Sequence, residues 1–331
     1  MTILHQPPPL PPVRPRYEPA SATEARSRLV GVVHYRDDEA TVDASDGTVS
    51  VVVPSPRNDL TETWPAEGEQ TDSGTSGDVC WAHDGENLFA AVSAPDAGVL
   101  GERVREAYTA LLSTTADLGF TCVYRIWNYL GRINHSNSVG LERYRDFCMG
   151  RSEAFEDMAW APDALPSGTG IGYATGGLTV FLLARRTADA FNIENPLQMP
   201  AYEYPDTYGP RSPSFARATA VGSQKGQSIF VSGTASIRGH RTIGSSLDEQ
   251  IMTTIENLDT LLSTYDGKEA RFKTLKIYVR RPQHMLTVAD AFRERYGLTA
   301  QEAPVLQADI CRSDLLLEVE GVAAPSWGAD R

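Results

Sequence analysis

The sequence lacks several features that define large classes of proteins. No apolar run approaches the roughly 18 residues that a membrane-spanning helix needs, and residues 1–20 show no basic segment followed by an apolar one. HExxH, a Walker A loop and a GxGxxG after a strand are absent. The cysteines lie too far apart for a zinc-ligand pattern or a CxxC pair; they are Cys80, Cys122, Cys148 and Cys311. We therefore predict no membrane span, secretory signal, metal or cofactor.

An excess of positive charge is also missing. The net charge of −13 argues against nucleic acid and anionic membranes as partners. It still permits a small anionic ligand, provided that arginines gather locally around it. Few, scattered cysteines are typical of reduced thiols, which favours the cytoplasm. With 331 residues, 41% of them hydrophobic, the chain is long enough for two domains that each bury a core.

The chain contains one pattern of elements twice. Apolar residues recur with helical spacing in residues 101–120 and again in residues 247–265. Each of these segments is followed by a predicted strand, 121–130 and 271–279, and then by a second amphipathic helix, 140–150 and 284–297. The order strand, helix, strand, helix, strand therefore predicts a duplicated α+β unit. The Pro- and Tyr-rich residues 192–214 form the predicted joint.

The second half resembles a known fold family. SIFVSGTAS, a helix, KTLKIYV and then CRSDLLLEVEGVA follow the order of elements in RidA-like (YjgF) domains. The resemblance implies an α+β fold of two such units in tandem, with mixed sheets and helices on one face. We expect a proline-rich arm at 1–26, a first domain at 27–195, and a second domain at 196–331 that carries the catalytic strand.

Further landmarks resemble the chorismatases. These landmarks are YRIWNYLGRIN, GLERYRDFCMGRSEAF, GTGIGYATGGLTVFLLA, NPLQMPAYEYP, SPSFARA and VSGTAS. Their order along residues 27–325 implies cleavage of the enolpyruvyl ether of chorismate, with release of pyruvate and without a cofactor. The Gly-rich segment is interpreted as a tight turn with close backbone packing.

The strand near the chain end carries the predicted acid. In ADICRSDLLLEVEGVA, residues 308–323, strand alternation puts Glu318 and Glu320 on one face, roughly 7 Å apart. By resemblance, Glu318 is the catalytic residue that protonates the enolpyruvyl methylene. A solvated strand glutamate is the alternative interpretation. Glu320 is expected in a supporting or surface position.

A cysteine separates two branches of the resembling family. Cys311 stands seven residues before Glu318, as in the branch that forms 3-hydroxybenzoate and pyruvate. A thiol there can relay a proton during aromatisation, although a small packed hydrophobe remains an alternative. In the other branch water gives pyruvate and 3,4-dihydroxycyclohexa-1,5-dienoate. A RidA-like metabolite binder without catalysis, and an imine deaminase, are less favoured hypotheses.

Chorismate carries two carboxylates, which arginine forks match. The resemblance implies that Arg312 holds one of them. Tyrosines are expected to pack on the ring or to bond its hydroxyl, although each also suits an ordinary core. The candidate substrate-binding residues are Arg312, Arg125, Arg143, Arg145, Arg217, Tyr124, Tyr173 and Tyr202.

Fusion of two units predicts the assembly and the place of the site. RidA-like proteins usually form trimers with ligand sites between subunits, and one fused pair already creates such a cleft. We therefore expect a monomer, with the pocket between the second sheet and the helices of the first unit.

Overall fold

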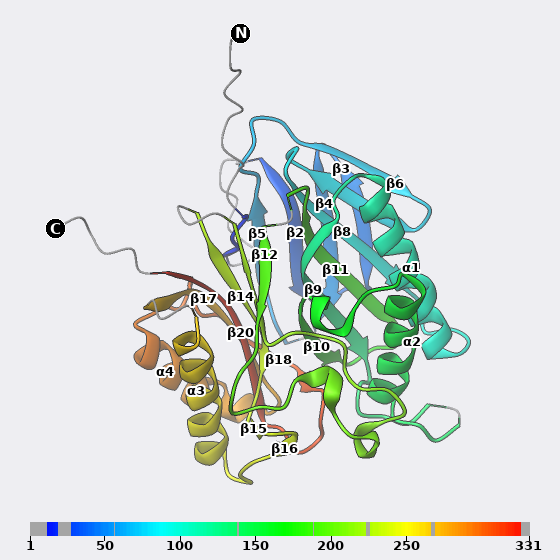
Figure 1. The fold of residues 1–331 in the computed structure, drawn as a ribbon. Coiled ribbons are helices and arrows are strands. Elements are labelled where there is room, and N and C mark those ends of the chain that lie inside the picture. Colours follow the sequence, from blue (N-terminus) through cyan, green and yellow to red (C-terminus); the bar gives the residue numbers. More distant parts are fainter. Residues whose placement is uncertain are drawn as a thin grey trace, which may run out of the picture.

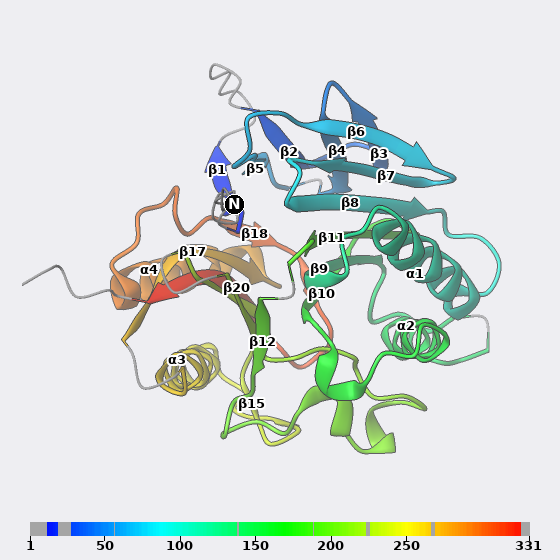
Figure 2. The same cartoon turned by 45° about the horizontal axis from the view of Figure 1, so that its top comes forward.

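The computed structural model describes residues 12–18, 28–55, 57–137, 139–187, 189–222, 226–265 and 269–325. In the described part of the chain, three mixed sheets meet around a shared core, four α-helices lie outside it, and a small two-stranded sheet joins β15 (Ile237–Arg238) to β16 (Arg241–Thr242) (Figures 1 and 2). The predicted α+β class is confirmed. None of the helices in the described part of the chain is long and apolar enough to cross a membrane.

The first unit is built on a seven-stranded sheet. Its order is β19 (Asp309–Ile310), β10 (Ser167–Tyr173), β9 (Cys122–Gly131), β11 (Leu178–Arg185), β8 (Asn87–Ala94), β7 (Val79–His83), β6 (Asp72–Ser76). Helices α1 (Leu100–Asp117) and α2 (Arg143–Asp157) cover one face of this sheet and bury an apolar cluster against β8, β9 and β11. Both helices lie where the apolar spacing predicts them.

A five-stranded sheet covers the opposite face, and we did not predict it. Its order is β1 (Arg16–Glu18), β5 (Leu60–Pro65), β2 (Leu29–Arg36), β4 (Thr48–Pro54), β3 (Thr41–Ser45). Trp64 of this sheet packs on Phe89 and Trp127 of the first unit, with ring centroids 6.5 and 5.1 Å apart. The predicted arm at 1–26 lies outside the described residues except for residues 12–18, which include β1.

The second unit has a six-stranded sheet. Its order is β12 (Ala190–Ile193), β13 (Ala218–Val221), β14 (Ser228–Thr234), β20 (Leu317–Pro325), β17 (Ala270–Val279), β18 (Val305–Gln307). Helices α3 (Leu247–Ser263) and α4 (Met285–Tyr296) pack on one face, as predicted. Helix α3 begins with a capping box in which Ser246 and Glu249 bond each other's backbone, and α4 ends at Gly297, whose φ is +66°.

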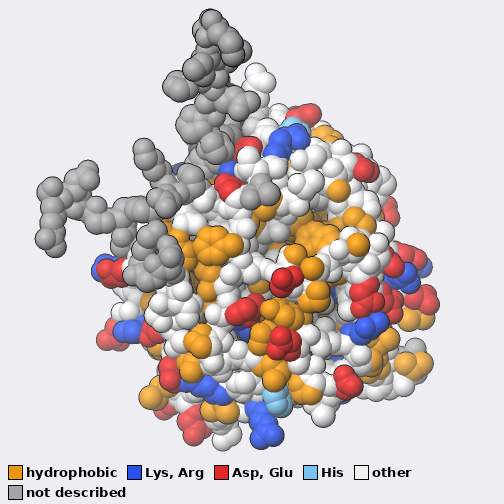
Figure 3. Space-filling model, viewed as in Figure 1, with side chains coloured by type: hydrophobic (Ala, Val, Ile, Leu, Met, Phe, Trp, Pro, Cys, Tyr) orange, Lys and Arg blue, Asp and Glu red, His pale blue; other side chains and the backbone are white. Residues whose placement is uncertain are grey.

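Each half of the chain contributes one strand to the sheet of the other half. Strand β12 precedes residue 195 yet belongs to the second sheet, and β19 comes from the second half yet pairs with β10 of the first. The helix-free faces of the sheets meet in a central core that contains Trp127, Phe181 and Tyr278. Residues 192–214 are mostly irregular, with two short 3-10 helices, η2 (Ala201–Glu203) and η3 (Asp206–Tyr208). Over this part of the molecule, apolar and acidic side chains are interspersed on the surface (Figure 3).

Candidate active site

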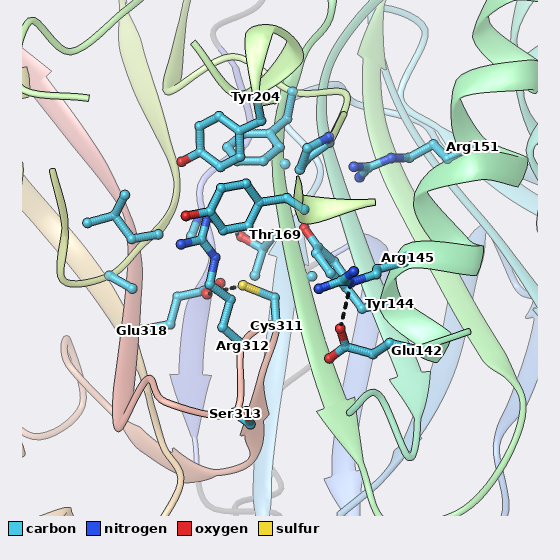
Figure 4. A pocket seen from close by; sticks show the side chains of 18 of the residues that line it. Glu142, Tyr144, Arg145, Arg151, Thr169, Tyr204, Cys311, Arg312, Ser313 and Glu318 are labelled. Atoms are coloured by element: carbon cyan, nitrogen blue, oxygen red, sulfur yellow. Dashed lines mark hydrogen bonds and ion pairs between the residues drawn. The ribbon is translucent and has the colours of Figure 1, made fainter. Parts of the chain in front are cut away.

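A cavity of about 310 Å³ lies between the two units. Helix α2 and β10 form its first-unit side, and β20 with residues 311–314 forms its second-unit side (Figure 4). Residues from the irregular segment, Tyr204 and Tyr208 among them, also line it. The cavity therefore lies between the second sheet and a helix of the first unit.

Glu318 reaches the cavity from the second residue of β20. Its side chain is 4% exposed and accepts a hydrogen bond from the Cys311 thiol, with Sγ 3.8 Å from Oε2. The pairing of β14 with β20 shifts register between Val231 and Thr234, and Gly233 lies in this irregularity. A Cβ at Gly233 would stand 2.0 Å from Glu318 Oε1. Only glycine leaves room for this carboxyl group.

The surroundings of Glu318 favour its neutral form. No ion pair joins it to a cation among the described residues. Burial, followed by the charge of Glu320, raises the pKa of Glu318 to about 8, against weaker opposition from Cys311, Arg125 and Arg217. At neutral pH the Glu318 carboxyl therefore carries a proton. Burial and the neighbouring Glu318 also raise the pKa of the Cys311 thiol well above its usual range, so the thiol stays protonated.

Glu320, two residues along the same strand, has the opposite surroundings. Its Oε2 lies 2.6 Å from Nη2 of Arg125 and accepts a hydrogen bond from Thr169. Its Oε1 lies 2.9 Å from Nζ of Lys276 and 2.9 Å from Nε1 of Trp127. Burial alone would raise the pKa of Glu320, but Lys276 and Arg125 hold it below its usual range. Glu320 is 3% exposed, so the surface position that we allowed for it is wrong and the supporting position stands.

Arg312 and Arg217 bring two cations to the second-unit side. Nη1 of Arg312 donates to the carbonyl of His240 at 2.9 Å, and its guanidinium lies 4.1 Å from the ring centre of Tyr208. Arg217 is 3% exposed and donates to Tyr204 Oη at 2.9 Å. These contacts fix the direction of both guanidinium groups, while Nε of Arg217 keeps no protein partner among the described residues.

Helix α2 brings two more cations to the opposite side. Arg151 is 3% exposed, and its Nε and Nη2 have no hydrogen-bond partner among the described residues. Arg145 bonds Glu142 at 3.2 Å and is partly exposed. Tyr144 stands seven residues before Arg151, two turns along the helix, and both side chains line the cavity. The Arg151 guanidinium lies 4.8 Å from the ring centre of Phe147 and interacts with Tyr108 and Cys148, and its donors without a partner suit an anion in the cavity.

Five predicted substrate-binding residues lie outside the cavity lining. Arg125 pairs with Glu320 behind the cavity, and Arg143 bonds Asp96 and the carbonyl of Gly131. Tyr124 packs on Phe230 in the central core, with ring centroids 4.9 Å apart. Tyr173 faces a separate acidic groove, and Tyr202 lines a separate hollow beside Trp160. The predicted residues that share the cavity are Glu318, Cys311, Arg312, Arg145 and Arg217.

Other lining residues were not among the predicted ones. Tyr144 lies on the face of α2 that also carries Arg151, so helical spacing could have identified this tyrosine. Thr169 follows the first glycine of GTGIGY in β10, whose close packing is confirmed: a Cβ at Gly172 would stand 2.3 Å from Ile133 Cγ2. Tyr204, Tyr208 and Phe215 come from irregular chain, where no period marks which side chains point inward.

In the described part of the chain, no three His, Cys, Asp or Glu side chains lie together in a way that could hold a metal ion. All four cysteines are described, and they are unpaired.

Comparison with known proteins places the chain. Residues 62–184 match the family described as chorismatase FkbO/Hyg5-like, N-terminal. A 3-hydroxybenzoate synthase of Streptomyces hygroscopicus is 38% identical over 311 residues, which cover 89% of this chain and 91% of the relative. A chorismatase of Streptomyces rapamycinicus is 36% identical over 321 residues, 92% of this chain and 95% of the relative. A solved chorismatase structure is 33% identical, with a TM-score of 0.88 over 95% of this chain and 99% of that one. The chain belongs to the chorismatase family.

Proposed function

We propose that this protein cleaves chorismate to pyruvate and 3-hydroxybenzoate. The observation that carries the proposal is the buried Glu318 carboxyl, which bonds the Cys311 thiol and no cation among the described residues, in a cavity lined by four arginines. An enol ether breaks when a proton is delivered to carbon, and a neutral carboxylic acid that is kept dry is suited to deliver it. The relatives named above support the same activity.

The four arginines suit a substrate with two carboxylates. Arg312 and Arg217 face the cavity from the second unit, and Arg145 and Arg151 face it from α2. Figure 4 shows Arg312 next to Cys311 and Glu318, with Arg145 and Arg151 across the cavity. Because the pairs lie on opposite sides, the ring of chorismate would be held between them. Its enolpyruvyl carboxylate would bind near Arg312, beside the acid. A volume of about 310 Å³ lies at the small end of ligand sites, for which roughly 300–1,000 Å³ is usual.

The first step would transfer the Glu318 proton to the enolpyruvyl methylene. This makes an oxocarbenium ion, which the Glu318 carboxylate then stabilises by its charge. The oxygen of the neighbouring ring hydroxyl attacks the ether-bearing carbon and loses its proton, so that an epoxide forms as the ether bond breaks and pyruvate leaves. The bond from this oxygen to its original ring carbon then breaks, the oxygen takes up a proton, and the carbon that now bears it loses its hydrogen as a proton, which gives the phenol. Chorismate and the two products contain the same atoms. The proton that leaves the ring can therefore restore Glu318, and no net proton is exchanged with water.

Cys311 lies where it can return that proton. Its Sγ is 3.8 Å from Glu318 Oε2, and the thiol is partly exposed toward the cavity. Because the thiol stays protonated, it would receive one proton from the ring as it passes its own to Glu318. A thiol in this place supports 3-hydroxybenzoate rather than the dihydroxycyclohexadienoate as the product.

We also propose that the enzyme works as a monomer in the cytoplasm. Both sides of the cavity come from one chain, and the four unpaired cysteines suit a reducing compartment. Light scattering on the purified protein tests the assembly. A stable trimer would contradict this part of the proposal.

The test of the activity is incubation of the pure protein with chorismate. Pyruvate is measured with lactate dehydrogenase and NADH, and the aromatic product is identified by chromatography. We expect equal amounts of pyruvate and 3-hydroxybenzoate. Pyruvate with the dihydroxycyclohexadienoate would place the protein in the hydrolytic branch, and no pyruvate at all would overturn the proposal.

A further inference from the structure

A buried cluster of charges lies behind Glu318 and takes no part in the chemistry proposed above. Its four charged members come from all three sheets. They are Glu62 of β5, Arg125 of β9, Lys276 of β17 and Glu320 of β20, and each is at most 3% exposed. Charges are rarely buried so deeply unless they are paired. The pairing within the cluster therefore determines which charges act on Glu318.

The cluster neutralises itself. Nζ of Lys276 lies 2.7 Å from Glu62 Oε2 and 2.9 Å from Glu320 Oε1. Nη2 of Arg125 lies 2.6 Å from Glu320 Oε2. Tyr35 adds a hydrogen bond to Glu62 at 2.6 Å and accepts one from Lys276 at 2.9 Å. Two cations thus face two carboxylates, while Nη1 of Arg125 has no hydrogen-bond partner among the described residues.

Glu320 is the member of the cluster that borders the active site. It lies two residues from Glu318 on the same face of β20, roughly 7 Å away. Thr169, which donates to Glu320, itself lines the cavity. After burial, the charge of Glu320 is the strongest influence that raises the pKa of Glu318, while Arg125 acts in the opposite direction. Glu320 therefore both repels the negative form of Glu318 and pairs with Arg125, a buried cation that favours that form.

Other groups face Glu318 from the elements packed around it. The strand β17 contributes Tyr278, which pairs in register with Glu318. Helix α2 contributes Tyr144, whose raised pKa, due mainly to burial, keeps it neutral. The remaining groups are Cys311, Arg312 and Arg217. Glu142 and Asp314 also line the cavity, but Glu320 is the anion whose charge does most to raise the pKa of Glu318.

We propose that Glu320 is a positioning residue: held as a carboxylate by Lys276 and Arg125, it keeps the proton on Glu318. This inference rests on the proposed role of Glu318 as the acid. It gives the buried cluster a function in the reaction, because without the charge of Glu320 the free Arg125 would draw Glu318 into its ionised form. Glu62 pairs with Lys276, which separates it from Glu320, so its charge acts on Glu318 less directly.

The direct test follows carboxyl carbons by NMR in protein labelled with 13C at the glutamate side-chain carboxyl. Glu318→Gln identifies the Glu318 signal, and no chorismate is added. In the unaltered protein we expect the Glu318 signal to titrate with a midpoint near pH 8, and Glu320 to remain ionised at pH 6. Glu320→Gln should lower the Glu318 midpoint by at least about one pH unit, the usual scale for a nearby charge.

Glu62→Gln is the matched control. It removes the same charge from the same cluster at similar burial, but on the far side of Lys276. We expect less than half the shift caused by Glu320→Gln. Equal shifts in the two variants, or an unchanged midpoint in Glu320→Gln, would overturn the proposal.

Two further results keep the test decisive. If Glu320→Gln does not fold, the unaltered protein still decides, because a protonated Glu320 at pH 6 would contradict the inference. The pyruvate assay is separate from the NMR titration. Loss of pyruvate release with the expected titrations would count against the proposed function alone, and normal pyruvate release with an unshifted Glu318 would count against the inference alone.

Discussion

The two sides of the cavity differ in the kind of group that they present. The second-unit side presents groups that hold a proton, Glu318 and Cys311, both kept neutral by burial. The first-unit side presents Arg145 and Arg151 from α2, whose guanidinium groups stay charged at any working pH. Proton transfer needs groups that can change their charge, whereas binding of a dianion needs groups that cannot.

From this difference we expect the proposed chemistry and the binding of the substrate to be divided between the two units. A substitution on the second-unit side should lower kcat or change the product, and a substitution on α2 should raise KM. Arg312 and Arg217 are the exceptions that sharpen the comparison, because they are cations on the side that holds the protons.

Glu318→Gln should have the largest effect. Glutamine keeps the shape and the hydrogen bonding of the side chain but cannot deliver a proton to carbon. We expect kcat to fall at least about 100-fold, with KM little changed, in the pyruvate assay. Glu294→Gln, on the exposed face of α4, serves as a control for the substitution itself. Near-normal pyruvate release by Glu318→Gln would remove this residue from the chemistry.

Arg312→Ala should have the next largest effect. Removing one partner of a close charge pair costs at least about 2 kcal/mol, or about 30-fold in kcat/KM. The aromatic rings of Tyr204 and Tyr208 should keep the local fold, which circular dichroism can check. Unchanged kinetics would show that Arg312 does not contact the substrate.

Arg151→Met tests the first-unit side. Methionine fills a similar volume without charge, so the loss is that of about one charged hydrogen bond, roughly 1.5 kcal/mol or tenfold. We expect this loss in KM, with kcat kept within about twofold. Arg103→Met, on the exposed side of α1, is the matched control. A fall in kcat at constant KM would show that Arg151 takes part in the chemistry, and would contradict the division of binding and chemistry between the two sides of the cavity.

Cys311→Ala should lower the rate least but change the product. Glu318 would still protonate the enolpyruvyl group, so pyruvate release should fall less than about tenfold. The ring would lose its assisted route to the phenol, and chromatography should show a shift from 3-hydroxybenzoate toward the dihydroxycyclohexadienoate. If 3-hydroxybenzoate remains the main product, the thiol only packs against its neighbours.

Much of the fold follows from sequence period. Helices α1, α3 and α4 begin and end within three residues of their predicted positions, and α2 extends seven residues past its predicted end, because each has one apolar stripe that must be buried. The five-stranded sheet was missed although one local signal was present, since β3 and β4 join through the two-residue turn Asp46-Gly47; its other pairings lie further apart in the sequence. Strands β2 and β4 pair in parallel, and β1 joins by pairing with β5. Short apolar runs such as VVV at 51–53 do not reveal such partners.

The site could be predicted where strand alternation and a family motif coincide, as at Glu318 and Cys311. Arg125 shows the limit. Its place in a strand between aromatic residues indicates burial, and it is buried, but a buried arginine can serve a structural carboxylate as well as a substrate. Its partner is Glu320, which lies 195 residues further along the chain. The sequence alone does not show whether this carboxylate or a ligand binds Arg125. Tyr204 and Tyr208 lie in irregular backbone, which has no repeating period from which the direction of their side chains could be predicted.

The pH dependence of kcat/KM tests the central claim most directly, because it reports the ionisation of the free enzyme. The raised pKa means that Glu318 holds its proton below about pH 8 and loses it above. The carboxylates of chorismate and the arginines do not titrate in this range. We therefore predict a level profile from pH 6 to pH 7 that falls about tenfold per pH unit above pH 8. A rate that instead increases as the pH passes 8 would show that an ionised group does the work, and would contradict the assignment of Glu318 as the acid.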